Sequence, residues 1–241
     1  MFVRTASLAC VLALAAILLP SVANASIGLP AIIRFDLSTG GSFDIELYDS
    51  TPLTKANFME YVNAGRYDNS FFHRLVPGFV LQGGGYYWTG PSTYSTVPTY
   101  GTVPNEASTL RPNNMWTVAM AKVPNAPDSA TSQWFINLAD NGGPPNNLDS
   151  ENGGYTTFGN VVAGFDTLSA IAGYPAWNAS SINGAWDSLP LSPAFDNTRP
   201  VYESDFVTIT NAYEIAPEPA TMALLAMGGG LAIIGRRRGR K

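Results

Sequence analysis

The sequence predicts a mainly β domain with two helices, and the spacing of its apolar residues is the evidence. Residues 32–37 and 42–47 alternate apolar and polar side chains, fully or in part, with the two-residue period of a half-buried strand. Further strand-like runs cover 116–122, 132–138 and 206–210. Only two stretches, 52–64 and 165–172, have the features expected of helices.

The first elements are a β-hairpin and a helix. The linker between the first two strands contains Gly40 and Gly41, which favours a tight turn. Thr51 is suited to cap the helix that follows, with Pro52 at its first position and Gly65 as its stop. The apolar residues that recur at helical spacing are Leu53, Ala56, Met59 and Val62.

Two long segments lack a sustained period. Residues 86–115 are expected to be mostly surface loop, and their aromatic side chains either pack on their own domain, which we favour, or extend a peptide- or glycan-binding face. Residues 175–200 form a polar insertion to which the sequence assigns no role. The second helix is expected to end at Gly173, before this insertion.

The most informative stretch is 71–85, where the only histidine, His73, is followed by Arg74 in an apolar run. Pro77 and Gly78 then indicate a turn. A buried guanidinium is costly unless it is paired or faces a water-filled cleft. Arg74 therefore either serves a cleft or extends its methylene stem from a core strand to solvent.

Three motifs in this stretch resemble the active-site segment of the cyclophilins, a family of peptidyl-prolyl isomerases. They are Phe72-His73-Arg74, Pro77-Gly78-Phe79 and Gln82-Gly83-Gly84. Two later segments, Ala121-Lys122 and Ser132-Gln133-Trp134-Phe135-Ile136, are similar to segments of bacterial cyclophilins. The resemblance implies a closed eight-stranded antiparallel β-barrel capped by two α-helices.

The resemblance also implies a role for each matching residue. Arg74 would be the catalytic hydrogen-bond donor to the substrate. The substrate-binding residues would be Phe79, Phe135 and Leu148 in a proline pocket, Gln82 holding the arginine and a substrate carbonyl, Ala121 and Lys122 in backbone contacts, Gln133 beside the adjoining groove, and Tyr155 where many animal members have histidine. Asn147 replaces a large aromatic residue of the family and Val80 replaces a methionine, so we expect a trimmed, shallower apolar wall.

Isomerisation of an X-Pro bond makes and breaks no covalent bond, so it requires no nucleophile, metal or cofactor, and we expect none. His73 could suggest a hydrolase, but no Gly-x-Ser-x-Gly elbow is present and a lone histidine beside aromatic residues is more often structural. A second histidine or a cysteine that could complete a zinc site is missing from residues 26–216.

Both ends of the chain resemble export signals. Residues 1–25 combine Arg4, an apolar run and the triplet Ala23-Asn24-Ala25, as a cleaved signal peptide does. Residues 216–241 combine Pro217-Glu218-Pro219, an apolar segment and a basic tail, in the manner of the PEP-CTERM sorting signal read by exosortases of Gram-negative bacteria. The alternatives for this tail are a plain C-terminal anchor and a lipid-binding basic cluster.

The net charge of the chain between the two export signals argues against nucleic acid as a partner. Residues 26–216 hold seven basic and seventeen acidic residues, a net charge of −10, which disfavours nucleic-acid binding. Cys10 lies in the leader, so the exported chain is expected to have no disulfide. We expect one cyclophilin-like domain over 26–215, monomeric, with transient inner-membrane association through 220–235.

Taken together, the residues and the resemblance predict a peptidyl-prolyl cis-trans isomerase acting on proline-containing peptides or proteins. The enzyme would be exported to the periplasm, cell surface or extracellular matrix of a Gram-negative bacterium. The alternative is a catalytically weak module of the same fold that holds proline-rich matrix partners.

Overall fold

The computed structural model describes residues 30–91 and 93–215, and the predicted signal peptide and sorting segment lie outside this part of the chain. The fold is mainly β with two α-helices, α1 (Pro52–Asn63) and α2 (Phe165–Ala172). The strands of the main sheet are β1 (Ile32–Leu37), β2 (Ser42–Leu47), β3 (Arg74–Val76), β4 (Val80–Gly83), β7 (Thr117–Met120), β8 (Trp134–Asn137), β9 (Thr157–Ala163) and β12 (Ile209–Ile215). Two short 3₁₀ helices cover Glu151–Gly153 and Glu203–Asp205.

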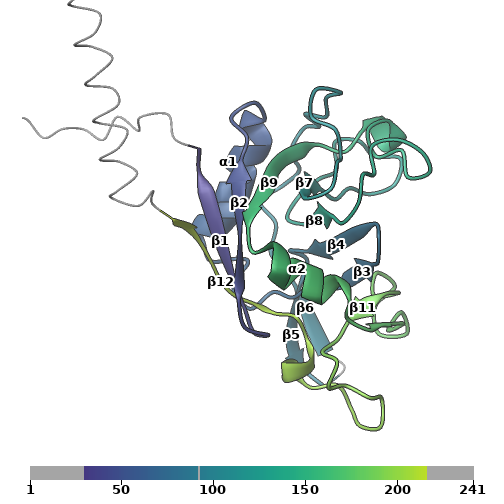
Figure 1. Ribbon diagram of the computed structural model, residues 1–241. Helices are drawn as coiled ribbons and strands as arrows, with labels where there is room; N and C mark the ends of the chain where they lie inside the picture. The colour runs from purple at the N-terminus through teal and green to yellow at the C-terminus, as the bar shows by residue number, and fades with distance from the viewer. Residues whose placement is uncertain (1–29, 92, 216–241) are drawn as a thin grey trace, which may run out of the picture.

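The main sheet is antiparallel and strongly curved, with the strand order β12-β1-β2-β9-β7-β8-β4-β3 (Figure 1). The expected closed barrel is wrong, because the terminal strands β12 and β3 do not pair along their length. The chain just before β3 crosses the gap instead, through an isolated bridge between Phe71 and Thr208 and a hydrogen bond from the Phe72 N–H to the Val207 carbonyl. A half-barrel results, and its opening is spanned by irregular backbone.

An aromatic core fills the concave side of the sheet. Phe35 and Phe43, from paired positions of β1 and β2, stack with their ring centroids 5.0 Å apart. Phe58 of α1 lies 4.8 Å from Phe158 of β9 and contacts Trp134 of β8 edge to face. Leu168 and Ile171 of α2 belong to the same buried cluster, so both helices help to close the core.

The hairpin and α2 agree with the sequence prediction, whereas α1 buries the expected face only in part: Val62 is buried and Met59 packs against the core, but Leu53 and Ala56 are exposed. Leu53 is 51% exposed, while Thr54, Phe58, Tyr61 and Val62 are buried. Thr51 occupies the N-cap position without a capping side-chain bond. The carboxylate of Glu106 accepts instead from the backbone N–H groups of Leu53 and Thr54, at 3.3 and 2.8 Å.

The two segments without a sequence period are more ordered than expected. Residues 86–115 contain a hairpin of β5 (Tyr86–Gly90) and β6 (Thr93–Thr96), packed on its own domain as we favoured. Residues 175–200 contain β10 (Ala176–Trp177) and β11 (Leu189–Pro190). This insertion forms a second apolar cluster with the main domain, comprising Phe71, Tyr86, Trp186, Leu189, Leu191, Phe195 and Phe206.

The insertion also covers the outer edge of the sheet. The backbone N–H of Leu75 in β3 donates to the Ser188 carbonyl at 2.7 Å, and the Ser188 hydroxyl donates to the Leu75 carbonyl. An exposed strand edge invites pairing with another chain. Residues 175–200, for which the sequence indicated only a polar insertion, therefore cover the free edge of β3, the strand that carries Arg74.

Between residues 30 and 215, apart from residue 92, no helix is both long and apolar enough to cross a membrane. The segment 220–235, for which membrane association is predicted, lies outside the described residues.

Candidate active site

A row of side chains runs across three strands on the face of the sheet opposite the main core. Arg74 of β3 is paired with Gln82 of β4, and Gln82 is paired with Phe135 of β8. Successive residues of a strand point to opposite faces. Leu81, Trp134 and Ile136 therefore enter the main core, whereas Gln82 and Phe135 face the other side.

The turn after β3 places Phe79 beside this row. Gly78 has a φ of 69°, a conformation that a residue with a Cβ adopts only at a cost. The Phe79 carbonyl accepts from the Leu138 N–H and from the Asn141 side-chain amide, both at 2.8 Å. The backbone at Phe79 is thus held in place by hydrogen bonds from two residues, Leu138 and Asn141.

Asn141 joins the two walls of the site, and sequence reasoning did not find it. Its side chain holds Phe79, and its carbonyl accepts from the Leu148 N–H at 2.9 Å. Its amide also donates to Asn137 at 2.8 Å, and its side-chain oxygen accepts from Asn146 at 2.7 Å. No local pattern distinguishes this asparagine from its neighbours in a loop rich in glycine and asparagine.

A small cavity of about 120 Å³ lies between these walls. Eight of the nine predicted site residues line it, together with Val80: Arg74, Phe79, Gln82, Ala121, Lys122, Phe135, Leu148 and Tyr155. The ninth, Gln133, accepts a 2.9 Å hydrogen bond from the Gln82 amide. Gly85 leaves room for it, since a Cβ there would come within 2.8 Å of the Gln133 amide nitrogen.

Asn147, the residue expected to trim one wall of the site, does not line the cavity. Leu148 and Tyr155 form that side of it. Tyr155 meets Phe135 edge to face, with 5.8 Å between ring centroids.

Lys122 stabilises the wall formed by Leu148 and Tyr155. Its ammonium donates to the carbonyls of Asn152 and Gly154 at 2.9 and 2.6 Å and lies 4.7 Å from the centre of the Tyr155 ring. Partial burial lowers the pKa of Lys122 below its usual value. The adjacent Ala121 donates its N–H to the Gln133 carbonyl at 3.0 Å.

Arg74 lines the cavity from β3. Its side chain is 29% exposed, and its Nε lies 3.4 Å from a carboxylate oxygen of Asp187 in the insertion. Within the described residues no hydrogen bond joins Arg74 to Gln82, whose amide is directed to Gln133. The holding of Arg74 by Gln82 stays a prediction, and Asp187 is a contact that the sequence did not indicate.

His73 is framework in this structure. It is fully buried, its ring meets Tyr86 edge to face at 4.8 Å, and neither ring nitrogen has a hydrogen-bond partner among the described residues. Burial, aided by the positive charge of Arg74, lowers the pKa of His73 to about 3. A histidine in this setting stays neutral and out of reach of a substrate.

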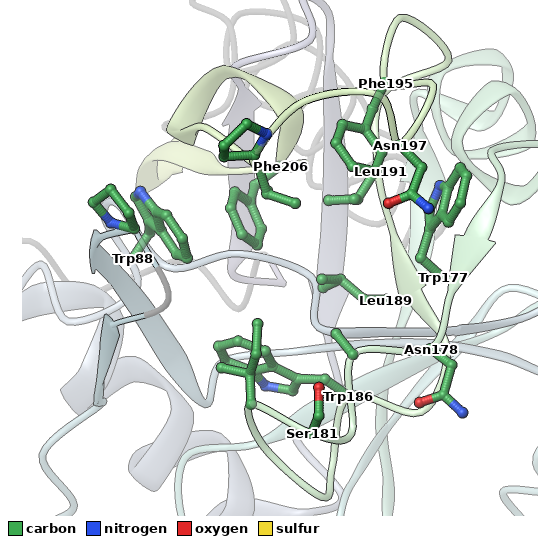
Figure 2. Close-up of a pocket in the computed structure, with 15 residues that line it drawn as sticks. Trp88, Trp177, Asn178, Ser181, Trp186, Leu189, Leu191, Phe195, Asn197 and Phe206 are labelled. Atoms are coloured by element: carbon green, nitrogen blue, oxygen red, sulfur yellow. The ribbon is translucent and has the colours of Figure 1, made fainter.

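A second cavity of about 290 Å³ lies between β5 and the insertion (Figure 2). Its walls are mainly aromatic and aliphatic, with Trp88, Trp177 and Trp186 prominent among them, and none of the lining residues is ionisable. None of the nine predicted site residues lines it. The smaller cavity is the candidate active site because eight of the nine predicted site residues line it, with the apolar side chains of Phe79, Phe135 and Leu148 beside Arg74 and Gln82.

Comparisons with known proteins identify the family of this chain. Residues 33–184 match the family model of cyclophilin type peptidyl-prolyl cis-trans isomerases, and residues 216–241 match the PEP-CTERM protein-sorting motif. The peptidyl-prolyl cis-trans isomerase of Acinetobacter baylyi is 38% identical over 154 residues, covering 64% of this chain and 76% of that protein. The isomerase cyp18 of Streptomyces antibioticus is 39% identical over 158 residues, covering 65% and 90%.

A solved structure of a cyclophilin-type isomerase from Cryptosporidium parvum supports the fold, with a TM-score of 0.57 and 21% identity over 78% of this chain and 99% of that one. The family match extends over more than half of the sequence and includes all the residues that line the small cavity. The chain therefore belongs to the family of cyclophilin-type peptidyl-prolyl cis-trans isomerases and ends in a PEP-CTERM sorting motif.

Proposed function

We propose that this chain catalyses the cis-trans isomerisation of X-Pro bonds in exported or surface proteins, with Arg74 as the catalytic residue. One observation carries the proposal: Arg74 lines a small cavity together with the apolar side chains of Phe79, Phe135 and Leu148. These apolar side chains suit a prolyl ring, and Arg74 would donate to the amide beside that ring.

The proposed mechanism follows from the energy barrier to rotation about an X-Pro bond. Rotation about an X-Pro bond breaks amide conjugation and meets a barrier of about 18–20 kcal/mol. In the twisted state the nitrogen lone pair is released and can accept a hydrogen bond. A donor that binds only this state lowers the barrier, because only interactions stronger in the transition state accelerate the reaction. Arginine is suited to the task because it is always charged and presents rigid donors.

Arg74 supplies only part of the acceleration. A hydrogen bond to a charged group contributes about 1.5–3 kcal/mol, which corresponds to some ten- to a hundredfold in rate. The remainder is assigned to the apolar cavity, which removes water from the amide, and to the fixed dipoles of Gln82 and Gln133. In this proposal the backbone around Ala121 and Lys122 aligns the residues before proline, and Tyr155 completes the wall.

The test compares the full chain with Arg74→Ala and Arg74→Lys in a cis-trans exchange assay on a proline peptide. We expect kcat/KM to fall about ten- to a hundredfold in Arg74→Ala. Arg74→Lys should recover little, because an ammonium lacks the planar fork. Lys55→Ala, a lost cation on α1 outside the cavity lining, is the matched control. Equal turnover in the wild type and Arg74→Ala would exclude the catalytic role, and proline-peptide binding without turnover would support a binding module.

We further propose that the protein is exported in a Gram-negative bacterium, with residues 1–25 as a cleaved signal and an exosortase acting on the tail. The support is the PEP-CTERM match, which begins at residue 216, directly after β12 ends at Ile215. Cleavage there would remove none of the described strands. Mass spectrometry of the mature protein should show ends near Ala25 and near 217–220, and a mature protein that retains Lys241 would favour a plain anchor instead.

A further inference from the structure

The insertion supplies a charged group to the active-site edge. Asp187 forms an ion pair with Arg74, in which Nε of the guanidinium lies 3.4 Å from a carboxylate oxygen. The Asp187 side chain is 57% exposed, so the pair is solvated and its orienting effect must come from how its backbone is held. The family match ends at residue 184, so Asp187 lies beyond it.

Both neighbours of Asp187 are fixed. Trp186 is fully buried and meets Phe71, Tyr86 and Tyr94 at centroid distances of 5.3, 5.5 and 4.8 Å. Ser188 exchanges two hydrogen bonds with Leu75, the residue that follows Arg74. The backbone on each side of the carboxylate is therefore tied to the domain, once through a core side chain and once directly to β3.

The other candidate for holding the arginine is engaged elsewhere. Gln82, the cross-strand neighbour of Arg74, donates its amide to Gln133. A long side chain such as arginine has many rotamers, and an unrestrained one spends little time in the productive geometry. Asp187 is the carboxylate within ion-pair distance of Arg74 among the described residues.

We propose that Asp187 is a positioning residue, which pairs with Nε and so keeps the terminal nitrogens of Arg74 directed at the substrate amide. The inference rests on the proposed function of Arg74 and adds to it a role for the insertion. Part of the catalytic geometry is then set by a segment outside the family match.

Kinetics of the full chain test this role. Asp187→Asn and Asp187→Ala should lower kcat/KM about two- to fivefold, as expected for a solvated ion pair. The loss should appear in kcat with KM little changed, because the pair acts on the orientation of Arg74 in the transition state. Asp187→Glu, which keeps the charge, should recover part of it. Glu203→Gln removes one exposed negative charge from the 3₁₀ helix after the insertion and should leave kcat/KM unchanged.

A readout without turnover keeps this inference separate from the proposed function. The Nε–H resonance of Arg74, assigned by its absence in Arg74→Lys, should have a high ¹⁵N order parameter in the wild type and a lower one in Asp187→Asn. If the wild type shows no isomerase activity, the proposed function fails, and the order parameter still decides whether Asp187 holds Arg74. The inference is overturned if Asp187→Asn leaves the order parameter unchanged, or if Glu203→Gln lowers kcat/KM as much as Asp187→Asn does.

Discussion

His73 and Arg74 are neighbours in the chain but occupy opposite environments. The arginine reaches the candidate active site, while the histidine is buried against Tyr86 with its pKa lowered to about 3. An unfolded histidine has a pKa near 6.5. Between pH 3 and pH 6.5, His73 is therefore protonated in the unfolded chain and neutral in the folded protein.

We therefore expect acid to destabilise the protein through His73. Stability from this residue is complete above pH 6.5 and falls as the pH drops toward 3, by at most about 1.4 kcal/mol per pH unit. Urea unfolding at several pH values would measure the slope. Carboxylates also titrate in this range, so the comparison is with His73→Phe, whose slope should be smaller by the histidine contribution. Identical slopes in the two proteins would show that His73 is not the group responsible.

The site residues divide by whether the chain carries a local signal for them. The placement of Arg74, Gln82 and Phe135 around one cavity was predictable, because they belong to short motifs whose strands are adjacent in the sheet. Asp187 was not predictable, because it reaches Arg74 only after a long irregular segment has folded over β3. Asn141 was missed for a related reason, since its role lies in which backbone groups it meets.

The secondary structure elements show the same division. The predicted ranges of β1, β2 and α2 match the structure. The two strands alternate apolar and polar residues, and α2 ends where a glycine follows it. The buried face of α1 was predicted only in part, since Val62 is buried as expected but the large side chains in the core are Phe58 and Tyr61. The insertion has no period, because Trp186, Leu189 and Leu191 enter its cluster from irregular backbone.

The start of α1 shows that a cap can come from a distant part of the chain. The first N–H groups of a helix lack partners within the helix and carry a partial positive charge. Glu106 satisfies two of them from the segment that follows the β5–β6 hairpin, while Thr51 donates its hydroxyl to the Tyr48 carbonyl. The helix is thereby attached to a segment that contains no regular structure.

We expect Glu106→Ala to lower the free energy of unfolding by about 0.5–2 kcal/mol, the usual range for a lost cap. Glu106→Gln should lose less, because an amide oxygen still accepts a hydrogen bond while the charge is gone. Urea denaturation followed by circular dichroism would measure both. Glu60→Ala is a matched control, because Glu60 is an acidic residue of α1 itself that lies away from the first turn. Equal losses in Glu106→Ala and Glu60→Ala would contradict the capping role.

The whole domain depends on how an open sheet is completed. Residues 69–72 bridge the gap to β12, and the insertion covers the free edge of β3. The insertion cluster includes Phe71 from before β3, Tyr86 from β5 and Phe206 from before β12. Because these three residues belong to the domain itself, the insertion is expected to unfold together with the sheet rather than as a separate unit.

Trp186→Ala tests this cooperativity. The side chain is fully buried, and replacing such a tryptophan with alanine typically costs about 3–5 kcal/mol. We expect one unfolding transition, shifted to lower urea, with coincident fluorescence and circular dichroism curves. Trp177→Ala is the control, because Trp177 packs at the periphery of the same cluster and is only partly buried, so its loss should cost less. An early, separate transition in Trp186→Ala, with the rest of the domain unchanged in stability, would show that the insertion is an independent flap. It would then be unable to hold Asp187 against Arg74 with the rigidity that positioning requires.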